Sequence, residues 1–297
     1  MEGNYILSAL EDYASVTNIS FTHDGQMLAT VKNNGEIQFW NLVGEQMSTR
    51  LDTKQQEITG ISFSSIKSII AVADRSGTVN LWDWSKIEQQ GLIPNPNQET
   101  VNLMSFSGDS KYLVTVGSDT TKLWNVSNPQ QPKFIKTLKD IKYSGGVSSV
   151  GFSSDGRIAI AARGDSKVNI WSASGKILQP LDTQHQGIIA ISFSQTNVHP
   201  FLATAGTDGI IKVWDWFKRK QIAEFKSDLK TIISLNFSPD GKKVIAGGDD
   251  GSIEDWSVQN LEELLETGCN WLEDYHSNNS ESATAKLCSE KTKNQTA

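Results

Sequence analysis

The sequence predicts an all-β protein of the β-propeller class, built as a ring of six four-stranded blades. Three observations predict it. Short runs of alternating apolar residues recur through most of the 297 residues, and this period-two pattern is typical of half-buried strands. Turn residues separate the runs, as in the stretch from His185 to Trp216. The whole pattern then returns at a nearly constant spacing, which indicates a repeated blade.

A phenylalanine and a tryptophan mark each copy of the repeat. Each phenylalanine lies 18 to 21 residues before its tryptophan, and successive tryptophans are 42, 42, 47, 43 and 42 residues apart. A period near 42 residues with strands throughout predicts one four-stranded blade per copy. The phenylalanines are Phe21, Phe63, Phe106, Phe152, Phe193 and Phe237. The tryptophans are Trp40, Trp82, Trp124, Trp171, Trp214 and Trp256.

Within a copy the elements follow one order. The first strand ends in a Ser-Phe-like pair, as in ISF at 191–193, and a turn such as SPDG at 238–241 follows in most copies. A second apolar strand then leads through a tight turn such as TDG at 207–209 into the strand that carries the tryptophan. Asp-Gly suits a hairpin because glycine adopts positive φ without a steric clash. The fourth strand is more variable, as we expect of an outer strand.

The six copies in phase resemble the WD40-repeat family. The literal Trp-Asp pair occurs only at Trp82-Asp83 and Trp214-Asp215, and the other copies read Trp-Asn or Trp-Ser. The resemblance extends over residues 16–256. It implies a single propeller domain over residues 1–258, a non-catalytic scaffold or sensor that presents propeller loops to a protein partner, and no cofactor.

The fifth copy carries what resembles the hydrogen-bonded tetrad of that family: His185, Thr204, Asp208 and Trp214. The resemblance implies that the aspartate accepts from the histidine, which bonds the threonine hydroxyl, which accepts from the indole N–H. A histidine beside an aspartate and a threonine also suggests a catalytic triad. All four residues fall on structural positions of the repeat, so we predict a structural role and no catalytic residues. No other copy has all four, and we therefore expect a less rigid ring than a consensus one.

The two ends of the repeat region predict how the ring closes. No fourth strand follows Trp256, whereas NYILSAL at 4–10 precedes the first copy and reads as a strand without a blade. We predict that this N-terminal strand completes the last blade, because closure removes exposed sheet edges that invite aggregation. An alternative is that the chain is the end of a longer array, since propellers range from about four to eight blades.

The C-terminal region predicts a short helical segment at 259–276 and a mostly disordered polar tail at 277–297. Asn260 with Glu263, and Asn270 with Glu273, have capping-box spacing. The helices either pack on the ring or bind a partner. The stretch GCNWLEDY at 268–275 is similar to the end of bacterial WD40 proteins whose repeats follow a NACHT or STAND-type NTPase. That resemblance implies a sensor fragment, with a signalling NTPase module as partner.

Composition and motifs restrict the function classes. The net charge of −7 and the pI of about 5.2 argue against nucleic-acid binding, which requires a basic surface. No run of eighteen apolar residues occurs, so we expect no membrane span. Cys269 and Cys288 lie outside the repeats, which fits a cytoplasmic protein without a disulfide framework. No HExxH or CxxC motif and no Walker A motif is present, so we predict neither a metal site nor a phosphate-binding loop.

The remaining candidates for binding lie in surface loops. Loops that enter a first strand lie on the same face as the turns before the tryptophan strands, and arginine and aromatic residues are the favoured anchors of interfaces. Four residues on this face are therefore candidates for partner binding: Tyr13, Arg75, Tyr143 and Arg163. The alternative function is an enzyme that uses the propeller channel or the top face, which would require converging acids or metal ligands.

Overall fold

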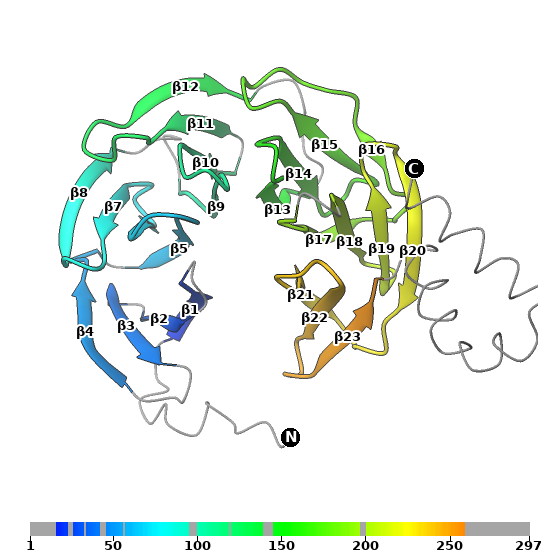
Figure 1. The fold of residues 1–297 in the computed structure, drawn as a ribbon, viewed down its shortest axis with the longest axis horizontal. Helices are drawn as coiled ribbons and strands as arrows, with labels where there is room; N and C mark the ends of the chain where they lie inside the picture. Colours follow the sequence, from blue (N-terminus) through cyan, green and yellow to red (C-terminus); the bar gives the residue numbers. More distant parts are fainter. Residues whose placement is uncertain are drawn as a thin grey trace, which may run out of the picture.

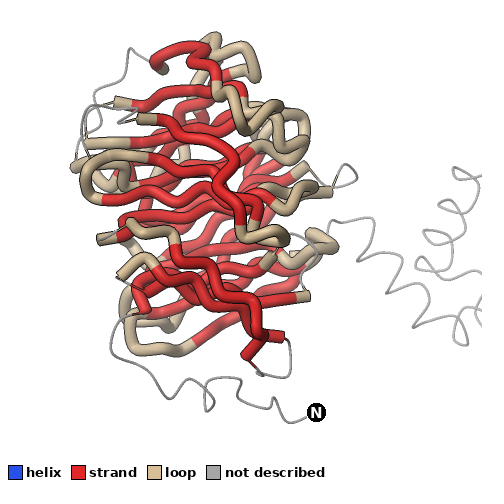
Figure 2. The backbone as a smooth tube through the Cα atoms, turned by 90° about the vertical axis from the view of Figure 1, so that its left-hand side faces the viewer, coloured by secondary structure: helices blue, strands red, loops and turns tan. Residues whose placement is uncertain are grey.

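The computed structural model describes residues 16–22, 26–32, 34–41, 46–55, 57–94, 100–118, 120–138, 145–196 and 200–258. Its strands form six antiparallel sheets arranged as blades around a central axis (Figure 1). From the side, the blades form a disc with loops on both faces (Figure 2). The predicted six-bladed propeller is thus confirmed, with four described strands in five blades and three in the sixth. Over these ranges, no helix has the length and apolar character needed to cross a membrane.

The strands of each blade follow the chain from the centre of the ring outward. Blades 1 to 3 consist of β1 (Val16–Phe21), β2 (Met27–Lys32), β3 (Glu36–Asn41), β4 (Gln46–Asp52), β5 (Ile58–Phe63), β6 (Ile69–Asp74), β7 (Val79–Asp83), β8 (Glu88–Ile93), β9 (Leu103–Phe106), β10 (Tyr112–Val116), β11 (Thr121–Asn125) and β12 (Lys133–Thr137). Blades 4 to 6 consist of β13 (Val147–Phe152), β14 (Ile158–Ala162), β15 (Lys167–Trp171), β16 (Leu181–Asp182), β17 (Ile188–Phe193), β18 (Phe201–Gly206), β19 (Ile210–Asp215), β20 (Lys220–Lys226), β21 (Ile232–Phe237), β22 (Lys243–Gly248) and β23 (Ile253–Ser257).

This strand order gives the disc two distinct faces. We call the top face the one that carries the turns between the second and third strands, such as β18–β19, and the connections from one blade to the next. The bottom face carries the turns on either side, such as β17–β18 and β19–β20. The top turns are tight because glycine takes positive φ there, +82° at Gly77 and +72° at Gly209.

The hydrophobic core is divided among the contacts between blades. Each of five clusters of buried side chains joins two consecutive blades, from blades 1 and 2 through to blades 5 and 6. The two middle strands of a blade supply residues to both of its neighbours because side chains alternate across a sheet. For example, β18 directs Ala203 toward blade 6 and Leu202 toward blade 4. Alternate residues of these strands therefore form the interfaces with the two neighbouring blades.

The contact between blades 6 and 1 differs from the other five. No buried cluster joins these two blades in the described part of the chain, and Figure 1 shows their ribbons standing apart. In blade 6, Lys243 and Asp255 form an ion pair of 2.8 Å at positions that hold Phe201 and Val213 in blade 5. Ile253, on the same strand as Asp255, is 74% exposed. The facing surface of blade 6 thus carries an ion pair and an exposed isoleucine, whereas the same surface of blade 5 is apolar and buried.

Blade 1 is also uncovered on the side toward blade 6. Ile19 is 65% exposed and Phe21 is 54% exposed, whereas their counterparts in blade 5, Ile191 and Phe193, are 7% and 5% exposed. The predicted closing strand at 4–10 and the predicted helical segment at 259–276 lie outside the described residues. Closure of the ring by the N-terminal strand therefore remains a prediction.

Deleting residues 1–10 tests that prediction. We expect a lower melting temperature, because the deletion would leave the edge of β23 and the apolar surface beside it uncovered. The measurement is thermal unfolding followed by far-ultraviolet circular dichroism. Deleting residues 277–297, the polar tail, is the matched control and should leave the melting temperature unchanged. Equal melting of the full chain and the chain without residues 1–10 would contradict closure by this segment.

Candidate functional site

The residues of the predicted tetrad lie in one continuous chain of hydrogen bonds within blade 5. Trp214 Nε1 donates to Thr204 Oγ1 at 3.0 Å, and that oxygen lies 3.0 Å from His185 Nε2. His185 Nδ1 lies 3.1 and 3.2 Å from the two carboxylate oxygens of Asp208. The indole N–H can only donate and the carboxylate can only accept, so Thr204 donates to Nε2 and the neutral imidazole donates from Nδ1. Each polar side-chain group in this series of four residues therefore has a hydrogen-bond partner within the series.

Local folding places these four residues together. Thr204 and Trp214 lie on paired strands, β18 and β19, with Thr204 opposite Lys212 and Trp214 opposite Leu202. Asp208 lies in the turn between these strands and also accepts a bond from the backbone N–H of Ile210 at 3.0 Å. His185 precedes β17 and completes the network from the inner side of the blade. Side-chain hydrogen bonds therefore connect β18, β19, the turn between them and the loop before β17, in addition to the backbone hydrogen bonds of the sheet.

Burial controls the charge of the histidine. The His185 side chain is 0% exposed and that of Asp208 is 19% exposed. Burial lowers the pKa of His185 below its usual 6.5, because desolvation disfavours the imidazolium. The bond and charge of Asp208 act in the opposite direction, and nearby Lys212 lowers the pKa further. The net result is a neutral imidazole at neutral pH, enclosed on both nitrogens and closed to any substrate.

Gly206 shows how closely the network fits the backbone. A Cβ atom at this position would collide with Asp208 Oδ1 and with Nδ1 of His185. The last residue of β18 must therefore lack a side chain for the histidine and the aspartate to meet. The tetrad thus constrains the β18–β19 turn, which is part of the top face.

Part of the network recurs in other blades in a form that the sequence interpretation did not include. Trp40 Nε1 donates to Thr30 Oγ1 at 2.9 Å, and Trp124 Nε1 donates to Thr115 Oγ1 at 3.1 Å. These threonines occupy the strand position of Thr204. In blade 2 the position holds Val72, and the buried Trp82 Nε1 has no hydrogen-bond partner. The available signal was a threonine three residues after the first residue of the second strand, on the strand that pairs with the tryptophan strand.

Blade 2 has a second partial network in which glutamine stands in place of histidine. Gln55 is 6% exposed, and its Nε2 donates to Asp74 Oδ2 at 3.0 Å. Like His185, it comes two residues after a threonine whose hydroxyl bonds the preceding blade turn, Thr53 to Gly35 O at 2.8 Å. The shared Thr-x-Gln and Thr-x-His spacing was present in the sequence, but the aspartate is shifted by two residues, from the middle of the turn to its start.

The two described candidates for partner binding, Arg75 and Arg163, are not brought together. Arg75 and Arg163 begin the corresponding top-face turns of blades 2 and 4, with blade 3 between them. The Arg75 guanidinium pairs with Glu57 at 3.6 Å. Arg163 is exposed, and its backbone N–H donates to Gly146 O at 3.1 Å. Tyr13 and Tyr143 lie outside the described residues.

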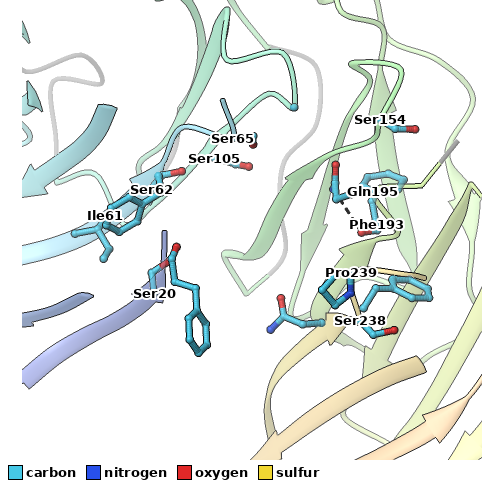
Figure 3. A pocket seen from close by; sticks show the side chains of 15 residues that line it. Ser20, Ile61, Ser62, Ser65, Ser105, Ser154, Phe193, Gln195, Ser238 and Pro239 are labelled. Atoms are coloured by element: carbon cyan, nitrogen blue, oxygen red, sulfur yellow. Dashed lines mark hydrogen bonds between the residues drawn. The ribbon is translucent and has the colours of Figure 1, made fainter. Parts of the chain in front are cut away.

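A cavity of about 880 Å³ occupies the bottom end of the central channel, and residues from all six blades line it. Its lining consists mostly of serine, phenylalanine and amide side chains, together with Ile61, Gly108 and Pro239, and contains no ionisable group (Figure 3). Gln195 is held across the wall by Nε2 bonds to Phe152 O at 3.4 Å and Phe193 O at 3.5 Å. These described residues supply neither an acid nor a base for catalysis. Nor does any group of three or more His, Cys, Asp or Glu in the described ranges have a geometry that could hold a metal ion.

The sequence matches the family model "WD domain, G-beta repeat" over residues 4–41, 45–83, 133–172, 175–215 and 219–254. These ranges cover more than half of the chain, and the chain therefore belongs to the WD40-repeat family. The family model does not match residues 84–132. The structure nevertheless places β9, β10 and β11 of this stretch in a four-stranded blade.

Particular relatives are similar to parts of the chain. Small ribosomal subunit protein RACK1 of Medicago sativa is 30% identical over 135 residues, which are 39% of this chain and 40% of RACK1. The Periodic tryptophan protein 2 homolog of Schizosaccharomyces pombe is 31% identical over 114 residues, 38% of this chain and 13% of that protein. The chain thus spans less than half the length of these relatives.

A solved structure has the same fold over a longer stretch. A chain of the crystal structure of the mitotic checkpoint complex superimposes with a TM-score of 0.69 and 17% sequence identity, over 84% of this chain and 76% of that chain. At this identity the likeness shows the fold alone. This chain therefore shares its fold with that chain of the complex, and nothing about partners follows from the likeness.

Proposed function

We propose that this chain is a non-catalytic interaction module, a scaffold or sensor that presents the loops of its propeller to a protein partner. One observation carries the proposal. Among the described residues, the one constellation that resembles catalytic machinery is His185 with Asp208 and Thr204. It is enclosed by its own hydrogen bonds, and the His185 side chain has no exposed surface. What the described part of the molecule offers to other molecules is its loops. The names of its relatives, a ribosomal subunit protein and a checkpoint complex, are those of assembly components.

The kind of partner follows from charge and composition. The net charge of −7 favours a protein partner over a nucleic acid, whose phosphates require a basic surface. Cysteine usage supports a cytoplasmic location, where thiols stay reduced. The similarity of residues 268–275 to the end of bacterial WD40 proteins with NTPase domains supports a narrower proposal, in which a signalling NTPase is the partner. Residues 259–297 lie outside the described part, so this proposal rests on sequence alone.

Affinity capture tests the proposed function. The tagged chain should enrich a specific protein from its native cells, and nuclease treatment should leave that protein bound. A variant with Arg75→Glu and Arg163→Glu should lose it, because both residues belong to the top face. A partner retained by the double variant would remove these residues from the binding surface. Failure to enrich any protein, together with an activity on a small molecule, would favour the enzyme alternative.

A further inference from the structure

A second cavity, of about 350 Å³, opens on the top face between blades 4, 5 and 6. Its volume falls within the range of about 300–1,000 Å³ that is common for ligand pockets. The walls are the β18–β19 turn, the segment leading into β21, and the first residues of β13 and β17. We refer to this cavity as the top pocket. It belongs to the face to which the proposed function assigns partner binding, and the inference below rests on that proposal.

The ionisable side chains that line the top pocket are both cations. Arg163 reaches it from the β14–β15 turn and Lys230 from the segment before β21. Both are exposed, and neither has an ion-pair partner among the described residues. Arg75, the counterpart of Arg163 in blade 2, is by contrast paired with Glu57. Two unpaired cations that line one pocket are informative in a chain whose net charge is −7.

No acidic side chain lines the top pocket. Asp208 lies in the wall-forming turn, but its carboxylate faces His185. Asp165, two residues after Arg163, accepts the backbone N–H of Lys167 at 3.1 Å. Asp249 lies on the adjacent β22–β23 turn, and none of the three lines the cavity. The tetrad therefore affects the surface as well as the core. Because the Asp208 carboxylate is bonded to His185, it does not line the pocket beside the two cations.

The rest of the lining combines apolar side chains with three small polar ones, those of Ser148, Thr207 and Thr231. Ile233 is 60% exposed, although its neighbour Ile232 is 2% exposed. Ile189 is half-buried and Leu229 is 8% exposed, so apolar surface continues into the pocket. On the wall formed by the β18–β19 turn, Gly206 and Gly209 add no side chain beside that of Thr207. The exposed Ile233 side chain therefore offers an apolar contact at the mouth of a pocket whose other apolar residues are largely buried.

We propose that the top pocket binds an acidic peptide segment of a protein partner, with a carboxylate between Arg163 and Lys230 and an adjacent aliphatic side chain against Ile233. The two cations favour a carboxylate on the peptide, and the exposed Ile233 favours an aliphatic residue next to that carboxylate. The chain has an acidic and apolar segment of its own, LEELLE at 261–266. However, β23 runs from the top face to the bottom face, so the described chain ends on the opposite side from the pocket.

The probe is a short fluorescein-labelled peptide with the core Leu-Glu-Glu-Leu, and binding to the full chain is followed by fluorescence anisotropy. Arg163→Gln and Lys230→Gln should each weaken binding by about tenfold or more, since each removes a charged hydrogen-bond donor. Ile233→Ser should weaken it as well. Arg75→Gln, in the matching turn of blade 2, is the control and should bind as the wild type does. The melting temperature of each variant shows that the fold is intact.

Peptide and chain variants separate the other occupants. A peptide with glutamine in place of both glutamates, or serine in place of both leucines, should bind at least about tenfold more weakly. Equal binding of the serine peptide, with full competition by acetate or inorganic phosphate, would mean a small-anion site and overturn the proposal. Tighter binding in a Glu262→Gln, Glu263→Gln variant would mean that the chain's own segment occupies the pocket, which also overturns it. Unchanged binding in the Arg163 and Lys230 variants would do the same.

The proposed function can fail or survive separately. If the Arg163→Gln, Lys230→Gln variant still captures the cellular partner while the peptide shows no binding to the wild type, the scaffold role stands and the top pocket is not its recognition site. If no cellular protein is captured but the peptide binds as expected, the top pocket is a peptide-binding site and the proposed scaffold function fails.

Discussion

Replacing Trp214 with alanine is expected to lower the free energy of unfolding by about 3–5 kcal/mol. Trp214 is 6% exposed and lies in the cluster that joins blades 4 and 5, together with Phe193 and Trp216. The substitution removes this packing and also the donor that holds Thr204. Trp214→Phe keeps most of the packing and should cost less, about 1–3 kcal/mol for the unsatisfied threonine. Urea unfolding followed by circular dichroism measures both values.

Trp256→Ala is the matched control. Trp256 occupies the same position in blade 6, but it is only half-buried, and Ala246 stands where Thr204 would be. Its removal should therefore cost clearly less than that of Trp214. If the two alanine variants lose the same stability, or if Trp214→Ala unfolds like the wild type, the importance we assign to the network in blade 5 is wrong.

His185→Ala is expected to cost about 2–4 kcal/mol, because it leaves a cavity and removes the partner of both Asp208 and Thr204. The wild type should also lose stability as the pH falls below 6.5, by up to about 1.4 kcal/mol per pH unit. In that range the unfolded chain takes up a proton at His185, whereas burial lowers the pKa of the folded histidine and keeps it neutral. Above pH 6.5 both forms are neutral and the dependence on His185 ends.

His185→Gln separates the two effects. Glutamine holds the corresponding place in blade 2, where Gln55 bonds Asp74, so this variant should retain more stability than the alanine variant. It cannot titrate, and it should therefore lose the contribution of His185 to the pH dependence between 6.5 and the folded pKa. Urea unfolding at pH 7.5 and pH 5.5 gives both quantities. An unchanged slope in the glutamine variant would show that other groups cause the acid sensitivity.

The blades could be predicted from the sequence because each one repeats the same spacing of strand and turn residues. The interval from Phe193 to Trp214 fixes two strands of a blade and the turns around them, and six similar intervals leave little freedom in the fold. The tetrad was accessible for the same reason, since its members occupy repeat positions. Both inferences depend on local spacing, which a linear sequence records directly.

Contacts between blades were harder to predict. The ion pair between Lys243 and Asp255 reads as an ordinary hairpin pair until the structure shows that these positions face blade 1. Likewise, Arg163 and Lys230 lie far apart in sequence, and only the ring brings them to one pocket. The bond from Gln55 to Asp74 was missed because the aspartate is shifted along the turn. Such pairs are determined by register and by the angle between blades, which no single repeat contains.

The ionisation of His185 gives the most direct test of the claim that this constellation is a structural network rather than a catalytic site. Long-range ¹H–¹⁵N correlation spectra, assigned with the His185→Gln variant, report the tautomer and the pKa of each of the four histidines in the chain. We predict a neutral ring with its proton on Nδ1 at pH 7, and a titration midpoint below 6.5. An imidazolium at pH 7, or a midpoint above 6.5, would contradict it.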